Sequence, residues 1–388
     1  MMGAVTSKSL MNLGFLLWII TEFVFLHTIY SQLALLFFFG AVILHIIYNH
    51  IFPLSKIYLL YLLFLITCCL NIWLGYSINP YESNKLIGTL WLNFIFLIFS
   101  YYYFYYQELS QIVDIMKVAA LLISFVTWGV NYSITREFFF RGSGGINANG
   151  MAILNAFVIS FLIITGKTAQ RKNLICIACL FLFCVISGTR KSFIILFVMI
   201  SVFYCFRYPK KLPKYLLMGV IGVGIALFLL LKIPFLYNYI GVRIEALILF
   251  AQGGEGDGSL VTRASFISLG MSHFKESPIW GNGINCFKTI PGAYGTYSHN
   301  NYVELLFSVG LVGTFSYYLL YLCTMIKGIT NYIKTKACGS VISIAVIISC
   351  LITDYAQVGY YDRSSLVFIT LAMAMIGRTL DNIENINS

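Results

Sequence analysis

The chain has 388 residues, of which 60% are hydrophobic and 10% are charged, and its mean hydropathy is +0.86. A soluble chain of this length needs far more polar surface. The net charge of +11 does not indicate nucleic-acid binding, because membrane proteins concentrate Lys and Arg in cytosolic loops. Apolar stretches of about 17–25 residues, the length that crosses a bilayer core as a helix, recur along the chain. The composition therefore predicts an all-α, polytopic protein of the lipid bilayer with no nucleic-acid partner.

Twelve apolar segments are predicted to form transmembrane helices in a single integral membrane domain, residues 1–388, with both termini on one side. Lys8 precedes the first segment and no small-residue cleavage pattern follows it, so this segment is predicted to be a span and not a removed signal. The predicted spans are residues 10–27, 30–48, 57–74, 86–106, 114–132, 150–166, 173–187, 192–206, 214–233, 299–322, 340–356 and 364–378.

The ten cysteines are scattered, and most lie inside apolar runs, which is typical of small apolar helix residues. Cys176 and Cys179 form a C-x-x-C pattern, but it has no partner pair and no nearby histidine. The sequence therefore predicts no disulfide framework and no zinc site.

The basic loops predict the orientation. With the N-terminus in the cytosol, residues 167–172, 207–214 and 327–336 are cytosolic and hold ten of the 25 Lys and Arg residues, which follows the positive-inside rule. The arginines depart from this rule, since six of the nine lie on the predicted outer side. These six are Arg136, Arg141, Arg190, Arg243, Arg263 and Arg363.

Arginine presents a planar fork of donors that binds phosphate oxygens in a bidentate manner. For any single arginine, snorkelling or pairing with an outer carboxylate explains its position as well as an anion-binding role does. For the whole set, an anion-binding site at the outer surface is the better explanation. Arg190 and Lys191 belong to this prediction, because SGTRKSF (187–193) places them at the tip of a helical hairpin with almost no loop.

One long loop, residues 234–298, lies between the ninth and tenth predicted spans, outside by this topology. Its GGEGDG (253–258) lacks the alternating acidic ligands and the distal Glu of a calcium loop, and we interpret it as a flexible loop. Apolar residues between Val261 and Phe274 fit one short amphipathic helix that ends near Pro278. The loop is too small and too poor in helix for a separate domain and is predicted to lie over the bundle as a lid.

His299 stands where the long loop re-enters the membrane. Asn300 lies beside it and Tyr302 lies three residues on, which predicts a polar cluster at a helix N-terminus. Glu304 follows about one turn deeper, where a carboxylate needs a partner or a purpose. Taken alone, a histidine at such a place is more often a helix-start or interfacial residue. A structural role and a functional role for His299 therefore both stay open at this point.

The order of these motifs resembles that of the O-antigen ligase/polymerase family of bacterial membrane glycosyltransferases. The resemblance covers roughly residues 136–322 and rests on NANGMA (147–152), SGTR (187–190), SLVTR (259–263), PIWGNG (278–283) and HNNYVELLFSVGLVG (299–313). It implies a twelve-helix bundle in the bacterial inner membrane, with cytoplasmic termini, a large outer loop between helices nine and ten, and an active site that faces the periplasm or the cell exterior.

The resemblance also implies a substrate and its binding residues. The substrate is an oligosaccharide on a polyisoprenyl diphosphate, and Arg190, Arg263 and His299 match the functional arginines and histidine of the family. The remaining residues predicted to line the diphosphate and glycan site are Arg136, Arg141, Arg243, Lys191, Asn300, Tyr302 and Glu304.

The chemistry agrees with these residue types. A sugar on a diphosphate already carries a good leaving group, so no carboxylic acid has to protonate it, unlike in glycoside hydrolysis. Arginines stabilise the charge on the departing diphosphate, each contributing ~2.7–4 kcal/mol by analogy with oxyanion donors. A neutral histidine accepts the proton of the attacking hydroxyl. The prediction is an inverting glycosyltransferase that needs no metal and no other cofactor.

Several alternatives stay open. A transporter or a lipid-linked-glycan flippase tends to show repeated halves and charges at the midplane, which this sequence lacks. A metal-dependent membrane glycosyltransferase carries an acidic motif in its first outer loop, whereas HTIY (27–30) has no carboxylate. Within the family, the lack of an added soluble domain favours a polymerase of O-antigen or capsule repeat units, working with a chain-length regulator in the membrane. An O-antigen ligase that uses lipid A core, or a protein-glycosylating ligase, is the alternative.

Overall fold

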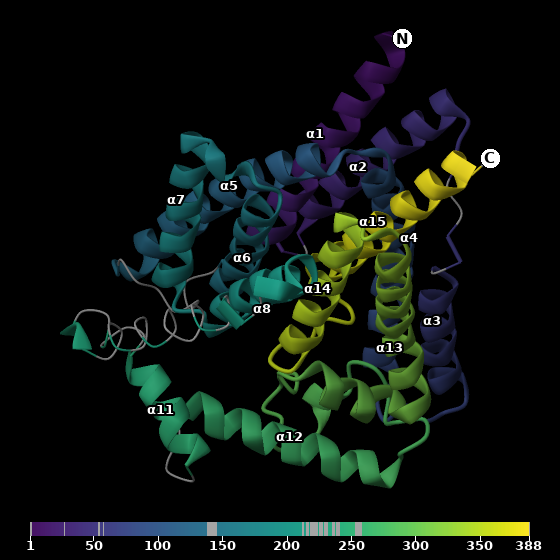
Figure 1. Ribbon diagram of the computed structural model, residues 1–388. Helices are drawn as coiled ribbons and strands as arrows, with labels where there is room; N and C mark the ends of the chain where they lie inside the picture. The colour runs from purple at the N-terminus through teal and green to yellow at the C-terminus, as the bar shows by residue number, and fades with distance from the viewer. Residues whose placement is uncertain are drawn as a thin grey trace.

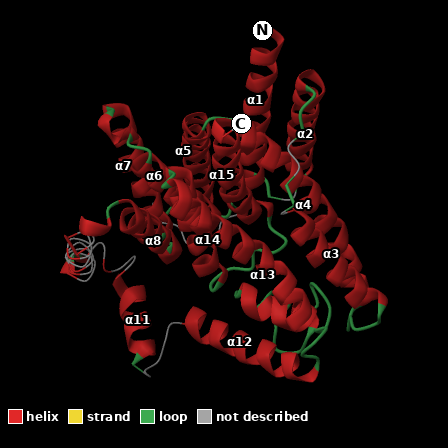
Figure 2. Ribbon diagram, turned by 45° about the vertical axis from the view of Figure 1, so that its right-hand side comes forward, coloured by secondary structure: helices red, strands yellow, loops and turns green. Residues whose placement is uncertain are grey.

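The computed structural model describes the chain except for residues 1, 27, 53–54, 57, 138–145, 212, 215–216, 218–223, 225–227, 229–231, 235–236, 238–240, 253–257 and 388. All regular secondary structure in the described part is helical (Figures 1 and 2). The α-helices are α1 (Met2–Val24), α2 (Ile29–Asn49), α3 (Tyr58–Trp73), α4 (Pro80–Tyr106), α5 (Leu109–Thr135), α6 (Ala148–Ile164), α7 (Arg171–Ser187), α8 (Arg190–Arg207), α11 (Val242–Ala251), α12 (Gly258–Glu276), α13 (Asn301–Thr335), α14 (Cys338–Asp354) and α15 (Arg363–Asn387). Three short 3-10 helices are η1 (Lys167–Ala169), η2 (Pro209–Lys211) and η4 (Phe287–Thr289).

Eleven of the twelve predicted spans coincide with a described helix, and the ninth, residues 214–233, falls largely outside the described residues. Four helices, α2, α4, α5 and α13, are long and apolar enough to cross a membrane. The helices α3, α6 and α14 are apolar but have at most 17 residues. The structure thus supports a polytopic helical membrane protein, while the full count of twelve spans stays a prediction.

Helices that are distant in the sequence pack side by side. The last helix, α15, packs between α4 and α14, while α13 contacts α3 and α14 contacts α8 (Figure 1). Aromatic side chains fill much of the core: Phe15 of α1 stacks on Tyr103 of α4 with ring centroids 4.6 Å apart, and Phe157 of α6 stacks on Phe368 of α15 at 3.8 Å. Such close packing, and not hydrophobicity, holds helices together within lipid.

The bundle has two distinct ends. Both chain termini lie at one end, here called the terminal end, and α12 lies across the opposite end, here called the loop end (Figure 1). The helix α12, predicted from the apolar residues of the long loop, is therefore present and lies over the bundle, packed against α13. The loop contains a second helix, α11, so it is richer in helix than expected.

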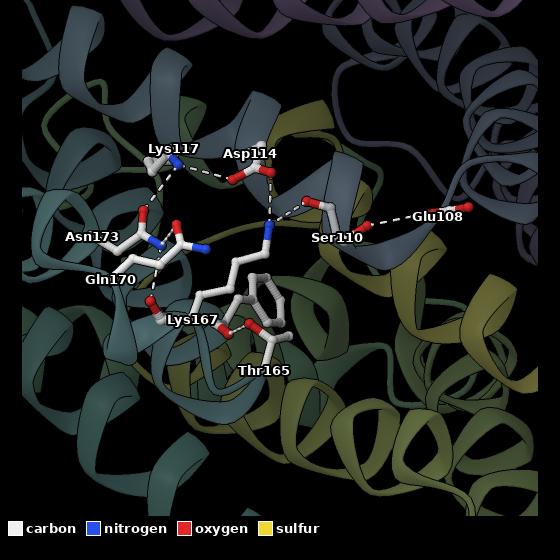
Figure 3. A network of polar contacts seen from close by, with 9 residues as sticks. Glu108, Ser110, Asp114, Lys117, Thr165, Lys167, Gln170 and Asn173 are labelled. Atoms are coloured by element: carbon white, nitrogen blue, oxygen red, sulfur yellow. Dashed lines mark hydrogen bonds and ion pairs between the residues drawn. The ribbon is translucent and has the colours of Figure 1, made fainter.

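A polar network joins α5, η1 and α7 (Figure 3). Asp114 of α5 accepts hydrogen bonds from Lys117 at 2.8 Å and from Lys167 of η1 at 2.7 Å. Lys117 also donates to the side-chain oxygen of Asn173 on α7, at 3.1 Å. These partly exposed charges contribute little stability each, but together they fix α5, η1 and α7 relative to one another.

The structure corrects the predicted role of one arginine. Arg363, the first residue of α15, was expected among the outer arginines that bind an anion, but it is buried and only 2% exposed. Its Nε lies 3.2 Å from Oε1 of Glu22, a fully buried residue of α1. A buried guanidinium needs such a partner because the desolvation of an unpaired charge is costly. Its charge is thus neutralised inside the protein.

Candidate functional site

The site is built on a break in α13. Gly310 has φ 62 and ψ −162, which is not helical, so residues 301–309 form a separate segment at the loop end. This corrects the expected span of 299–322, which the structure divides at Gly310 and extends to Thr335. The polar backbone groups at the break bond to the PIWGNG stretch: Leu311 N donates to Pro278 O at 2.8 Å, and Gly283 N donates to Ser308 O at 2.8 Å.

Glycine is required on both sides of this junction. A Cβ on Gly310 would collide with the carbonyl oxygen of Ile279, and a Cβ on Gly281 would lie 2.5 Å from Gly310 N. Both residues also have positive φ values, 75 at Gly281 and 62 at Gly310, which disfavour other side chains. The conformation of the long loop and the start of α13 therefore depend on each other.

The turn before α13 holds His299 in the left-handed region, with φ 60. On its N-terminal side, Ser298 N donates to Oε2 of the buried Glu304 at 2.8 Å. On its C-terminal side, Asn300 caps α13, because its Oδ1 accepts hydrogen bonds from Tyr302 N at 3.0 Å and Val303 N at 3.2 Å. Asn300 and Glu304, both predicted to bind substrate, thus act here as supports of His299.

The same turn is anchored to the last two helices. Asn301 Oδ1 accepts hydrogen bonds from Gly359 N at 2.9 Å and Tyr360 N at 3.2 Å, while its Nδ2 donates to Asp354 at the end of α14, at 3.1 Å. The hydroxyl of Tyr302, another predicted substrate residue, donates to Leu351 O at 2.7 Å. These bonds fix the first turn of α13 against α14.

The helix α12 brings Arg263 and Phe266 to this turn. Phe266 is 2% exposed and packs in a second hydrophobic cluster, whose other buried members are Cys286, Phe287, Ile290, Ala293 and Phe307. The ring of Phe266 stacks on His299, with centroids 6.1 Å apart and an interplanar angle of 10°. Arg263 lies three residues before Phe266, hence on the same side of α12.

Charges from three parts of the chain meet at His299. Burial, followed by the positive charges of Arg263 and Lys191, lowers the pKa of His299 to about 4. Burial and the charge of Arg263 lower the pKa of Lys191 to about 7. Burial raises the pKa of Tyr297, while the nearby charge of Arg263 opposes that rise. Lys191, Arg263 and His299 therefore influence one another directly, although they lie in three separate motifs.

The SGTR tip is bonded to the NANGMA stretch. Gly188 ends α7 with φ 62, and Thr189 donates from Oγ1 to Oδ1 of Asn149 on α6, at 2.8 Å. Arg190 then begins α8 and is partly exposed. The Thr189 side chain does not cap α8, so the positive end of the helix dipole faces the same region as the two cations.

Of the three other predicted arginines, the structure describes the side chain of Arg136 alone. Arg136 is exposed and ends α5 with φ 60; its role stays a prediction. Arg141 and the side chain of Arg243, which belongs to α11, lie outside the described residues.

Sequence reasoning missed Tyr297 and Phe266, which surround His299; the ring centroids of Tyr297 and His299 are 4.4 Å apart. The density of Gly and Tyr in PGAYGTYSH (291–299) was the available signal.

In the described part of the chain, no group of three or more His, Cys, Asp or Glu is arranged to hold a metal ion.

A comparison with curated protein sequences gives no significant match. Residues 175–318 match a family model described as O-antigen ligase. The matched segment starts in α7 and ends in α13, so it contains the SGTR tip, α12, the PIWGNG stretch and His299. The match covers less than half of the chain and shows that this segment, in a chain built of apolar helices, is similar to the O-antigen ligase family.

Proposed function

We propose that this protein is a membrane glycosyltransferase that transfers an oligosaccharide from a polyisoprenyl diphosphate to a sugar hydroxyl. The observation that carries the proposal is the meeting of Lys191, Arg263 and His299 at the loop end, from a hairpin tip, a loop helix and the start of α13. We propose further that the loop end faces the periplasm or the cell exterior and that both termini are cytoplasmic, because the positive-inside rule predicts cytosolic basic loops.

In this proposal Arg263, Arg190 and Lys191 bind the diphosphate. Two neighbouring cations without a bound anion repel each other, which is one cause of the low pKa of Lys191. A bound diphosphate replaces this repulsion with attraction, so the binding energy includes relief of the unfavourable charge pair. During transfer, the bond between the anomeric carbon and the diphosphate oxygen breaks, its electron pair leaves with the diphosphate, and the cations stabilise the added charge.

His299 is proposed as the general base. Because its pKa is about 4, its imidazole is neutral at physiological pH and able to accept a proton. A base with so low a pKa is weak, but a bound diphosphate neutralises the two cations that depress it. Substrate binding therefore strengthens the base at the moment it is needed. The proton of the attacking hydroxyl moves to His299 as the new glycosidic bond forms, with inversion at the anomeric carbon.

Glu304 and Asn300 are proposed as positioning residues. Glu304 holds the peptide on one side of His299 and Asn300 holds the other. A non-glycine residue in the left-handed region persists only where its surroundings fix it, and these two side chains supply that fixation. Arg136, Arg141 and Arg243 stay candidates for contacts with more distant parts of the glycan.

Between the two branches of the family, we propose a polymerase of O-antigen or capsule repeat units, with a ligase that uses lipid A core as the alternative. The purified protein is incubated with lipid-linked repeat units, with and without lipid A core. A ladder of products without core indicates a polymerase, and a single adduct formed only with core indicates a ligase. Unchanged substrate in both incubations would contradict a glycosyltransferase of either kind.

A further inference from the structure

The turn that precedes His299 contains an unusual tyrosine. Thr296 N donates to Ala293 O at 3.1 Å, which closes a four-residue turn. Its central residues, Tyr294 and Gly295, both have positive φ values, 52 and 73. This is the pattern of a type I′ turn, whose first central position normally carries Asn, Asp or Gly. A tyrosine in the left-handed region is an outlier, because its Cβ crowds the backbone.

Burial does not explain why a tyrosine occupies this position. Tyr294 is 86% exposed, more than any other large hydrophobic residue described in the chain. An exposed side chain gains little hydrophobic stabilisation to offset an unfavourable backbone conformation. Conformational strain that folding does not require is found mostly at binding and catalytic sites.

The tyrosine continues a line of rings that ends at the charged site. Tyr294, Phe266, His299 and Tyr297, here called the aromatic row, are neighbours in that order. The ring centroids are 6.5 Å apart between Tyr294 and Phe266, 6.1 Å between Phe266 and His299, and 4.4 Å between His299 and Tyr297. Arg263 lies on the same side of α12 as Phe266, and its charge acts on Tyr297. Exposed rings at Tyr294 and Tyr297 thus flank the residues proposed to bind the diphosphate.

We propose that Tyr294 and Tyr297 bind the sugar rings attached to the diphosphate, as a saccharide subsite of the transferase. This assignment rests on the proposed function. The carbon–hydrogen face of a pyranose is apolar and packs on an aromatic ring, while its rim of hydroxyls accepts and donates hydrogen bonds, for which a tyrosine hydroxyl is suited. A sugar on a diphosphate therefore matches a surface where cations and exposed tyrosines adjoin.

An anchor in the lipid headgroups is the other use of an exposed aromatic residue. The loop end has such a region, where Trp73, 80% exposed, stands beside the exposed Leu74 and Ile78. The neighbours of Tyr294 are of another kind, since the residues around it in the sequence are Gly292, Ala293, Gly295 and Thr296, and Ala293 is fully buried. The absence of exposed aliphatic side chains in this turn favours a saccharide over lipid.

The test compares two ligands that differ only in sugar. One is the lipid-linked oligosaccharide extracted from membranes of cells that make this protein, and the other is undecaprenyl diphosphate without sugar. We expect Tyr294→Ala to weaken binding of the first about tenfold, the effect of one lost ring contact, and to leave binding of the second unchanged. Tyr294→Phe should retain most of the affinity because it keeps the ring. Tyr81→Ala, which removes another exposed tyrosine at the loop end, should change neither affinity.

A second measurement separates binding from folding. Asn suits the first central position of this turn, so Tyr294→Asn should keep or raise the melting temperature while it weakens binding of the oligosaccharide as Ala does. A lowered melting temperature would make Tyr294 a structural residue and overturn the assignment. Equal loss of both ligands in Tyr294→Ala, or loss of neither, would also overturn it. If the wild-type protein binds neither ligand, the proposed function itself is wrong, and the assignment of the saccharide subsite is wrong as well.

Discussion

Phe266 and His299 stack face to face, 6.1 Å apart at an angle of 10°, although one lies on a loop helix and the other at the start of a bundle helix. This contact couples the position of Arg263, three residues before Phe266, to the position of His299. A movement of α12 would therefore displace Arg263 together with the ring that packs on His299, so the proposed site includes this loop helix.

Removal of the Arg263 side chain should abolish transfer without unfolding the protein. We expect Arg263→Ala to lower the rate about 100- to 1,000-fold, the effect of losing one strong donor to a developing negative charge. The rate of product formation from lipid-linked oligosaccharide measures this. Lys275→Ala is the matched control, because Lys275 is an exposed cation on the same helix. Equal losses in both variants would mean that α12 contributes only general positive charge.

The pH dependence should reveal how substrate tunes His299. The pKa of His299 is about 4, lowered by burial and by the charges of Arg263 and Lys191. The acid limb of kcat/KM, which reports the free enzyme, should therefore lie near this value. The limb of kcat should lie at higher pH, because the bound diphosphate neutralises the cations and raises the pKa of the imidazole.

The variant Lys191→Met sharpens this prediction. Removal of one positive charge raises the pKa of His299 in the free enzyme, so the acid limb of kcat/KM should move to higher pH. His273→Ala, which removes the histidine of α12, should leave both limbs in place. A kcat limb at lower pH than the kcat/KM limb would contradict the proposed role of the diphosphate.

Diphosphate binding should take up protons at Lys191. The pKa of Lys191 is about 7, so at about pH 8 the Lys191 amine is mostly neutral. A bound anion favours the charged amine and raises this pKa, which draws a proton from solution. Titration calorimetry in buffers with different ionisation enthalpies measures the uptake. Lys191→Arg, which is always charged, should bind with no uptake from this position. The same uptake in wild type and Lys191→Arg would exclude Lys191 as its source.

The junction at Gly310 should tolerate no side chain. Gly310→Ala and Gly281→Ala should each destabilise the protein by about 2 kcal/mol or more, because a Cβ would collide with the opposing backbone at a positive φ. Thermal unfolding in detergent measures this. Gly88→Ala is the control, since a Cβ at this exposed position in α4 meets nothing within 4 Å and should stabilise the helix slightly. Unchanged stability in Gly310→Ala would show that the junction is adaptable.

The buried pair of Arg363 and Glu22 should be structural. Arg363→Met alone should destabilise the protein by about 3–5 kcal/mol, because it leaves a buried carboxylate without its partner. The double variant with Glu22→Leu removes both charges and should recover most of the stability. We expect this double variant to retain transferase activity. A well-folded but inactive double variant would instead support Arg363 as one of the arginines that bind the anion.

The sequence by itself determined the membrane character, the positions of eleven helices and the existence of α12. These follow from local patterns, because an apolar run long enough to cross lipid must satisfy its own backbone hydrogen bonds as a helix, whatever surrounds it. It also singled out Lys191 and Arg263 as cations on the predicted outer side of the membrane, where the positive-inside rule disfavours them, and the resemblance to a known family added His299.

Only the tertiary structure decided how these residues are used. Arg363 resembles the other outer arginines in the sequence, yet Glu22, 341 positions away, neutralises it. Asn300 and Glu304 lie beside His299 in the sequence, yet their bonds show them supporting its turn. The break in α13 depends on backbone groups of a distant loop. For Arg363 and for the break in α13, the deciding partner comes from another part of the chain, and local pattern carries no information about which distant groups a fold brings together.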